Sequence, residues 1–404
     1  MTLATSNRSR IRYIKESAFG VIPTSGSVRS LRFTGESLGF TFQTTTSKEI
    51  RSDRQTTDLT QTGASATGSI NFELSYGEYD PLFEAFLQNT WSVFGTGGLG
   101  PVGLSEVASV GTFTTSTLTA ATATSGAGIF TNLVKGQWVK ITGSSISANN
   151  KIVQVSRTVS PTSTVITFEG TPFTAGAGGS AIQISSSRLI NGTSESSWTI
   201  ERGLEDVSQF FAYRGMSADK LNLKFASGTI TEGSLEFMGR DSTRGNATQL
   251  TGTLVPSLSY DVQNAVSGVG DVREGGSTLT GTFIKSVDLN LSNNLRARDA
   301  IGVLGAASVG SGSISVTGTL EVYLADGSMY QKFIDNVASS LSLYTVDGAG
   351  NGYVIELPKL KYSDAKVNNG GLNTDVMLSM PFTALVDPVL GYTISLCRVG
   401  TALV

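Results

Sequence analysis

The chain has 404 residues, of which 39% are hydrophobic and 15% charged, and it contains 47 glycines. Its formal net charge of −3 gives no sign of the clustered Lys and Arg of a nucleic-acid-binding face. With no histidine, it lacks the usual general base and every His-containing zinc site. An enzyme working through carboxylates stays open, but we expect no enzyme activity, no cofactor and no metal.

Processing and membrane signals are also missing from the sequence. The N-terminal residues have no apolar core of a signal peptide, and no apolar run could span a bilayer. The single cysteine, Cys397, excludes an intramolecular disulfide and is expected to be a buried thiol. We therefore expect a soluble chain made in a cytoplasm.

A long polar connection follows a predicted strand at residues 31–42. It contains the run RSDR, with Arg51, Asp53 and Arg54 close together. The connection is too long for a plain hairpin, and long loops are often functional. Alternating Arg and Asp would suit pairing with a neighbouring subunit, while a disordered surface loop is an equally open interpretation.

The next strand runs directly into a helix. Apolar and polar residues alternate over residues 68–74, which is the period of a half-buried strand. Asp80 can then cap a helix N-terminus, and Pro81 suits a first helical turn. The predicted apolar stripe of this helix consists of Leu82, Phe83, Phe86 and Leu87.

An extra segment lies between Trp91 and Trp198. Alternation with turn residues every ten or so positions predicts a small all-β module. Gly98, Gly100 and Gly103 match the spacing of a dinucleotide fingerprint, but Pro101 interrupts it and no helix follows. We interpret that run as a linker.

A second copy of the strand-to-helix pattern appears near residue 318. A strand at residues 283–292 and a connection with the run RARD precede it; this run contains Arg296, Arg298 and Asp299. Ser328 is a candidate cap for the second helix, whose predicted stripe is Tyr330, Phe333, Ile334 and Val337. A pair of antiparallel strands is predicted after each helix, at residues 220–239 and 353–385. The two parts therefore look like a diverged duplication.

Clustered carboxylates raise the question of catalysis. Glu73, Glu78, Asp80 and Glu84 lie close in sequence, and a glycosidase needs two carboxyls flanking one bond. They fall on different predicted elements, and Asp80 has a capping role available. Caps and solvated faces are the favoured interpretation.

The outer parts of the chain resemble a known family. The run EIRSDRQTTDLTQTGASATGSINFELSYGEYDPLFEAFLQNTW is similar to the signature segment of major tail tube proteins of long, non-contractile (siphovirus-type) phage tails. The opening IRYIKESAFGVIPTSG and the later SISVTGTLEVYLADGSMYQKFIDN resemble the same family. The likeness covers about two thirds of the chain in the family's order, and it leaves out the inserted module, which varies among related proteins.

This resemblance implies a mainly β fold: two tandem β-sandwich or barrel repeats, each with a flanking helix, plus an inserted all-β domain. We expect residues 1–99 and 193–265 to form the first repeat, residues 100–192 the insert, and residues 266–404 the second repeat. Family members with one such domain form hexameric rings, so a chain with two should close as a trimer with pseudo-sixfold symmetry. The insert should lie on the tube exterior.

The function implied is that of a structural virion protein, whose stacked rings form a conduit for DNA ejection. It would be located in the virion tail and made in the host cytoplasm. The implied partners are further copies of itself and the tape-measure, tail-tip and tail-terminator proteins, with DNA passing unbound and no membrane. The alternatives are a capsid decoration or adhesin-like β-protein that binds a surface glycan, and a glycan hydrolase of the tail tip.

Two sets of site residues follow from these interpretations. The strand faces opposite the apolar residues would line the pore, with the acids Glu73, Glu236, Asp288, Glu321 and Asp375 and with Arg32 and Lys285 as the exceptions. An acidic lumen would repel DNA, which carries one charge per ~1.7 Å of duplex, and leave it free to slide. Ordinary solvated strands are the alternative. The loops at Arg51, Asp53 and Arg54 and at Arg296, Arg298 and Asp299 would bridge subunits or rings.

Overall fold

The computed structural model describes residues 3–92, 104–108, 111–120, 130, 132–179, 182–264, 269–278 and 283–400. The predicted linker glycines Gly98, Gly100 and Gly103 lie outside these ranges, as do the predicted boundaries near residues 99 and 265. Strands dominate the described residues, which confirms the mainly β prediction. Their two α-helices are short, α1 (Asp80–Leu87) and α2 (Ser328–Ile334), and neither could cross a membrane.

The first half of the chain, residues 3–92 and 193–264, forms two connected layers. Its strands are β1 (Ser9–Lys15), β2 (Ser27–Leu31), β3 (Gly35–Glu36), β4 (Gly39–Thr46), β5 (Leu59–Glu73), β14 (Trp198–Leu204), β15 (Gln209–Ala226), β16 (Glu232–Gly239), β17 (Asp241–Gly245) and β18 (Thr253–Val255). The long strand β15 belongs to both layers. Its first part pairs with β14 and β17, and its last part pairs with β16.

The second half, residues 269–400, is built the same way. Its strands are β19 (Val269–Glu274), β20 (Ser277–Thr278), β21 (Ile284–Ser292), β22 (Arg296–Arg298), β23 (Ser308–Gly310), β24 (Ser315–Tyr323), β25 (Ser339–Val346), β26 (Gly352–Tyr362), β27 (Lys366–Asn369), β28 (Val376–Ala384) and β29 (Ser395–Val399). Here β26 takes the place of β15: it pairs with β25 and β29 near its start and with β28 near its end.

The same antiparallel pairings therefore occur in both halves. The pairings β1–β14, β14–β15 and β15–β17 are matched by β19–β25, β25–β26 and β26–β29. The pairings β15–β16, β16–β5 and β5–β4 are matched by β26–β28, β28–β24 and β24–β21. The predicted antiparallel strand pairs after each helix are present. Pairing of β15 with β21 joins the two halves into one sheet, called here the inner sheet, in the order β4, β5, β16, β15, β21, β24, β28.

Two glycines occupy matching places in this sheet. Gly68 of β5 lies opposite Phe237, and Gly318 of β24 lies opposite Phe382. A Cβ at either glycine would lie 2.4–2.6 Å from a backbone carbonyl oxygen of the adjacent strand. Gly68 also has a φ of +152°, a region that L-residues rarely adopt. Only glycine lets the neighbouring strands approach this closely.

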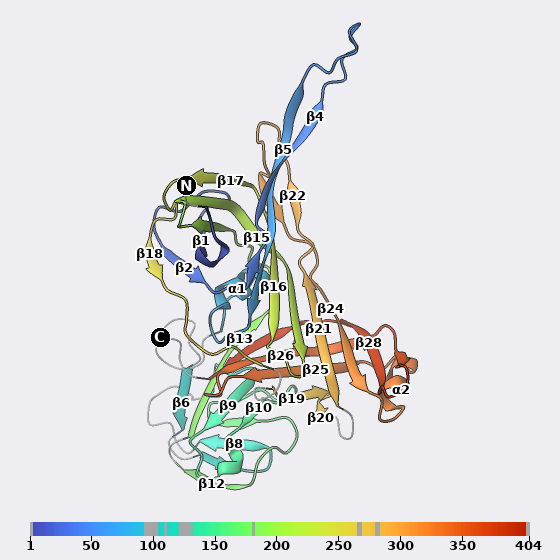
Figure 1. Ribbon diagram of the computed structural model, residues 1–404. Helices are drawn as coiled ribbons and strands as arrows, with labels where there is room; N and C mark the ends of the chain where they lie inside the picture. The colour runs from blue at the N-terminus through green and yellow to red at the C-terminus, as the bar shows by residue number, and fades with distance from the viewer. Residues whose placement is uncertain are drawn as a thin grey trace.

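The inserted segment, residues 104–190, has a hydrophobic core of its own. Its strands are β6 (Leu104–Ala108), β7 (Gly111–Phe113), β8 (Thr117–Ala120), β9 (Trp138–Thr142), β10 (Ile152–Gln154), β11 (Val165–Thr167), β12 (Gly176–Gly179) and β13 (Ile182–Ile190). Buried residues from Phe113 to Ile184 form a cluster separate from the main core, which spans both halves. Figure 1 shows this segment below the inner sheet, at the end away from the projecting β4–β5 hairpin.

Candidate assembly and lumen surfaces

One face of the inner sheet is polar and runs across both halves. Glu73 lies opposite Glu232, and Glu232 lies opposite Lys224. Lys224 in turn lies opposite Asp288, which lies opposite Thr319. Directly opposed residues of antiparallel strands project from the same face, so these side chains form one continuous polar surface, called here the polar face.

Four of the five acids predicted for a lumen share the polar face. Glu236 lies opposite Ser69, two residues from Asn71 and four from Glu73, and Glu321 follows Thr319 by two residues. The alternate residues are buried in the core, among them Ile70, Leu235, Leu289 and Leu320. Asp375 is exposed and lies just before β28.

Bases on the polar face were missed by the sequence analysis. The Lys220 ammonium lies 2.8 Å from the Glu236 carboxylate, and this hydrogen bond raises the pKa of Lys220. Lys224, Lys361 and Lys366 belong to the same face by register. Alternation of Lys220, Asn222 and Lys224 with leucines could have revealed two of them.

Strand alternation places neither of the two bases named from the sequence, Arg32 and Lys285, on the polar face. Arg32 donates from Nη1 to the carbonyl oxygens of Leu258, at 3.3 Å, and Tyr260, at 2.7 Å. It therefore ties down the segment after β18. Lys285 is exposed at a register shift between β21 and β24, where alternation does not set the face.

A shallow depression of about 630 Å³ lies on the polar face where the halves join. Its lining includes Asn71, Lys224, Glu232, Asp288 and Asn290. Charges of both signs meet there, so the acidic excess is smaller than the sequence analysis predicts. The acids of the face outnumber by one the lysines that the register places on it: Glu73, Glu232, Glu236, Asp288 and Glu321 against Lys220, Lys224, Lys361 and Lys366.

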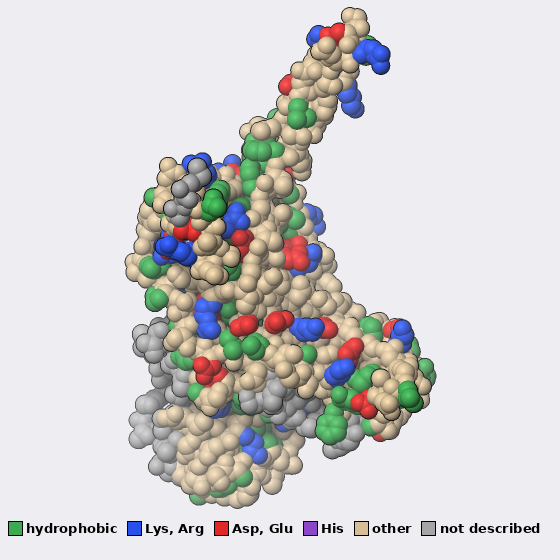
Figure 2. Space-filling model, in the orientation of Figure 1, with side chains coloured by type: hydrophobic (Ala, Val, Ile, Leu, Met, Phe, Trp, Pro, Cys, Tyr) green, Lys and Arg blue, Asp and Glu red, His purple; other side chains and the backbone are tan. Residues whose placement is uncertain are grey.

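The predicted bridging loops are both hairpins. The β4–β5 hairpin projects far from the body, with Lys and Arg side chains displayed at its end (Figures 1 and 2). At its tip Arg51 Nη2 lies 2.7 Å from Asp53 Oδ2, and Arg54 has a φ of 60°. The shorter β22–β23 hairpin holds Arg296 and Arg298 in β22 and Asp299 at the start of its loop, and all three are exposed.

A buried ion pair joins the start of α1 to the second half. Asp80 accepts a hydrogen bond from Arg398 of β29, and both side chains are almost fully buried. The Tyr353 hydroxyl donates to Asp80 Oδ1 at 2.6 Å and accepts from the Gly77 N–H at 2.7 Å. The Arg398 guanidinium also lies 5.3 Å from the centre of the Trp91 ring.

This contact overturns the capping role predicted for Asp80. The N-cap residue of α1 is Tyr79, and no side chain caps the helix. Asp80 is the first helical residue, and its carboxylate is held by Arg398, 318 positions along the chain. Burial alone would lower the pKa of Arg398, but the facing Asp80, Tyr353 and Tyr76 more than reverse this, so its pKa is raised and the cation persists.

The two helices differ in how much of their surface is covered. In α1 the predicted residues Leu82, Phe83, Phe86 and Leu87 are all buried. In α2 only Met329 is buried, while Tyr330, Ile334 and nearby Val337 are 37%, 56% and 50% exposed. Of the predicted stripe, Phe333 is half-buried against the main core, while the other three residues are largely outside it. Ser328 does not cap it either, because Gly327 is the N-cap residue.

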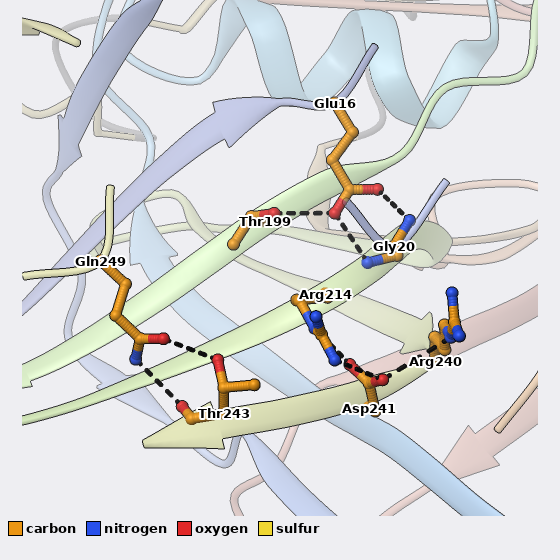
Figure 3. A network of polar contacts seen from close by, with 9 residues as sticks. Glu16, Gly20, Thr199, Arg214, Arg240, Asp241, Thr243 and Gln249 are labelled. Atoms are coloured by element: carbon orange, nitrogen blue, oxygen red, sulfur yellow. Dashed lines mark hydrogen bonds and ion pairs between the residues drawn. The ribbon is translucent and has the colours of Figure 1, made fainter. Parts of the chain in front are cut away.

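A polar network fixes the N-terminal segment to β14 and β15. Buried Glu16 accepts hydrogen bonds from the Gly20 N–H at 2.7 Å, the Thr199 hydroxyl at 2.7 Å and the Gly215 N–H at 2.9 Å (Figure 3). Nearby, Arg214 and Asp241 form a bidentate ion pair, with Nε to Oδ1 at 2.6 Å and Nη2 to Oδ2 at 2.7 Å. Gly215 lies where β15 passes from one layer to the other, so this network braces the bend.

The inserted segment is attached to the second half, although its chain interrupts the first. Residues 187–190 of β13 pair with β29. Gln154 Nε2 donates to Glu356 Oε1 at 2.5 Å, and Arg157 Nη2 donates to the Pro358 carbonyl at 2.7 Å. The segment therefore bridges the halves.

The contact at Glu356 predicts a pH dependence. Burial raises the pKa of Glu356 to about 7, above its ordinary 4.5. The folded chain then holds this proton more tightly than the unfolded chain, so the stability that protonation contributes is present below pH 4.5 and is lost as pH rises through 7. The difference corresponds to at most about 3 kcal/mol.

We expect Glu356→Gln to raise the free energy of unfolding at pH 8 and to change it little at pH 5. Glutamine keeps the oxygen that accepts from Gln154 but carries no charge. Denaturant unfolding at both pH values measures the effect, with the exposed Glu49→Gln as the control. A variant as pH-dependent as the parent would contradict the assignment.

Comparison with known proteins identifies the family of the chain. No curated protein matches the chain. A family model described as phage tail tube protein matches residues 6–384, which include both halves and the inserted segment. The chain therefore belongs to the phage tail tube protein family and is a structural component of a phage virion.

Proposed function

We propose that three copies of the chain close into a ring, and that stacked rings form the tail tube through which DNA leaves the virion. The observation that carries the proposal is the repeated pairing order of the two halves. Each half of the chain would form one segment of the ring, called here a wedge. Each chain therefore supplies two similar wedges, and three chains would supply six. A head-to-tail interface yields a closed ring only if its rotation returns to the start.

The polar face is assigned to the lumen in this proposal, and the inserted segment to the tube exterior. The hairpins that carry Arg51, Asp53 and Arg54 and Arg296, Arg298 and Asp299 are assigned to contacts with neighbouring subunits or rings. The family likeness supports tape-measure, tail-tip and tail-terminator proteins as partners. The domain limits stay as proposed from sequence, at residues 1–99, 100–192, 193–265 and 266–404.

Mass measurement on isolated rings, with negative-stain microscopy of the purified protein, tests the proposal. Rings with an open centre and three subunits are expected. Six copies per ring would contradict the assignment of two wedges to each chain. Particles without a pore would favour a decoration or adhesin role.

Lysine replacements on the polar face should slow DNA ejection. We expect phage carrying Glu73→Lys and Glu321→Lys to assemble tails but to release DNA more slowly, because cations at the lumen would attract the phosphates. The matched control is Asp261→Lys, an exposed acid of the segment after β18. If the phage carrying Glu73→Lys and Glu321→Lys releases DNA as fast as the parent and the control, the charge of the polar face has no role in ejection.

A further inference from the structure

The junction between the two halves shows how one wedge fits the next. In the inner sheet, β15 pairs with β21 from Lys220 to Ala226. Outside it, α1 is covered by the second half through Tyr353 and Arg398. Asn293 also donates from Nδ2 to the Phe86 carbonyl at the end of α1, at 2.7 Å. One strand edge and one helix are thus buried together.

The same kinds of surface are uncovered at the two ends of the chain. Within the described residues, β4 pairs with β5 alone and β27 with β28 alone, so the other edge of each has no strand partner. Just before β4, side chains of the same half bond that edge: the Leu38 N–H donates to Glu36 and its carbonyl accepts from Tyr213. Apolar side chains are exposed on β4, on β27 and on α2: Phe42 is 45% exposed, Val367 44% and Ile334 56%. Figure 2 shows hydrophobic side chains gathered around the end of the molecule that carries α2.

We propose that these surfaces bind each other between copies of the chain. The open edge of β27 pairs antiparallel with residues 37–41 of the next copy, as β15 pairs with β21, and that copy covers the apolar side of α2. This inference rests on the ring proposed above and specifies its interface. An exposed strand edge is a template for such pairing, and the two edges belong to opposite ends of one sheet, as a head-to-tail contact requires.

The two glycines of the inner sheet fix one side of the register. A Cβ at Gly68 would meet the Ser37 carbonyl oxygen at 2.6 Å, and a Cβ at Gly318 would meet the Asp288 carbonyl oxygen at 2.4 Å. Ser37 and Asp288 therefore hold equivalent positions, one in each half.

The phenylalanines opposite these glycines fix the other side. Lys224 lies opposite the residue five positions before Phe237 (237 − 232). Asn368 lies opposite the residue five positions before Phe382 (382 − 377). Lys224 and Asn368 are therefore equivalent. Since Lys224 lies opposite Asp288 at the internal junction, Asn368 lies opposite Ser37 of the next copy.

Paired cysteines test this register in the full chain. Ser37 and Asn368 are both exposed, and the one native cysteine, Cys397, is buried. Opposed antiparallel residues have Cα atoms about 4.5–5.5 Å apart, within the range that a disulfide spans. Ser37→Cys with Asn368→Cys should therefore link chain to chain when tubes are oxidised, giving a ladder that ends at three chains on a denaturing gel.

The matched control moves one cysteine along the strand. Asp364 is exposed and four residues from Asn368, a displacement of roughly 13 Å along an extended strand. The yield of disulfide-linked chains from Ser37→Cys with Asp364→Cys should be at least about tenfold lower. Equal linking of both pairs, or tubes without linking of the first, would overturn the register while leaving the tube function intact.

Hydrogen exchange on the parent chain gives an independent readout. Amides of β27 and α2 should become protected when monomers assemble, and unchanged exchange in formed tubes would overturn the interface. Failure of the parent chain to form rings or tubes at all would instead count against the proposed function, and with it this interface.

The helix is tested separately. Ile334→Glu should raise the protein concentration needed for assembly about tenfold or more, with the monomer's unfolding unchanged. Val159→Glu is the control, because Val159 is also half-exposed but belongs to the inserted segment. Equal effects of the two substitutions would overturn the role of α2.

Discussion

Replacing Arg398 by methionine is expected to lower the free energy of unfolding by about 3–5 kcal/mol, because Asp80 would remain buried without its cation. Tyr353 would be the remaining hydrogen-bond donor of the site to that carboxylate. Denaturant unfolding monitored by tryptophan fluorescence measures the loss, since Trp91 lies against the guanidinium.

The double variant separates the ion pair from simple packing. Asp80→Leu combined with Arg398→Met should cost less than the sum of the single changes, because neither charge is then left buried alone. Arg51→Met is the matched control: its partner Asp53 is exposed, so the free energy of unfolding should be nearly unchanged. Additive losses in the double variant would contradict the coupling.

Gly318→Ala is expected to destabilise the second half by about 1–3 kcal/mol. The new methyl group would lie 2.4 Å from the Asp288 carbonyl oxygen and 2.5 Å from the Phe382 ring. Neither neighbour can yield freely, because both belong to the paired strands of the inner sheet. Thermal unfolding of the variant measures the effect.

Gly327→Ala serves as the control for that change. Gly327 precedes α2 with a φ of −85°, and nothing lies within 4 Å of a Cβ there. The substitution should leave stability unchanged or slightly higher. A Gly318 variant as stable as this control would show that the strands can move apart.

Local alternation explains why much of the fold could be predicted from the sequence. The pattern from Ile70 to Leu74 identifies both the strand and its buried face, because side chains of a strand point to opposite sides in turn. The start of α1 was also foreseeable from Asp80 and Pro81. What alternation cannot show is which distant strand supplies a partner.

The errors in the prediction share that origin. Asp80 was interpreted as a cap because its partner Arg398 lies near the other end of the sequence. The apolar stripe predicted for α2 is mostly exposed, because apolar spacing alone does not say what covers a helix face. Arg32 was assigned to the polar face, whereas backbone carbonyls of a segment more than 220 residues later hold it.

The bridging position of the inserted segment gives the proposed ring two unequal kinds of seam. Within a chain, the two halves are joined by the polypeptide itself, by the Asp80–Arg398 ion pair and by the pairing of β13 with β29. Between chains, the seam would be closed by a strand edge and an apolar helix face. Weaker seams can reopen and close again, so a ring built this way can correct a misplaced subunit without unfolding any wedge.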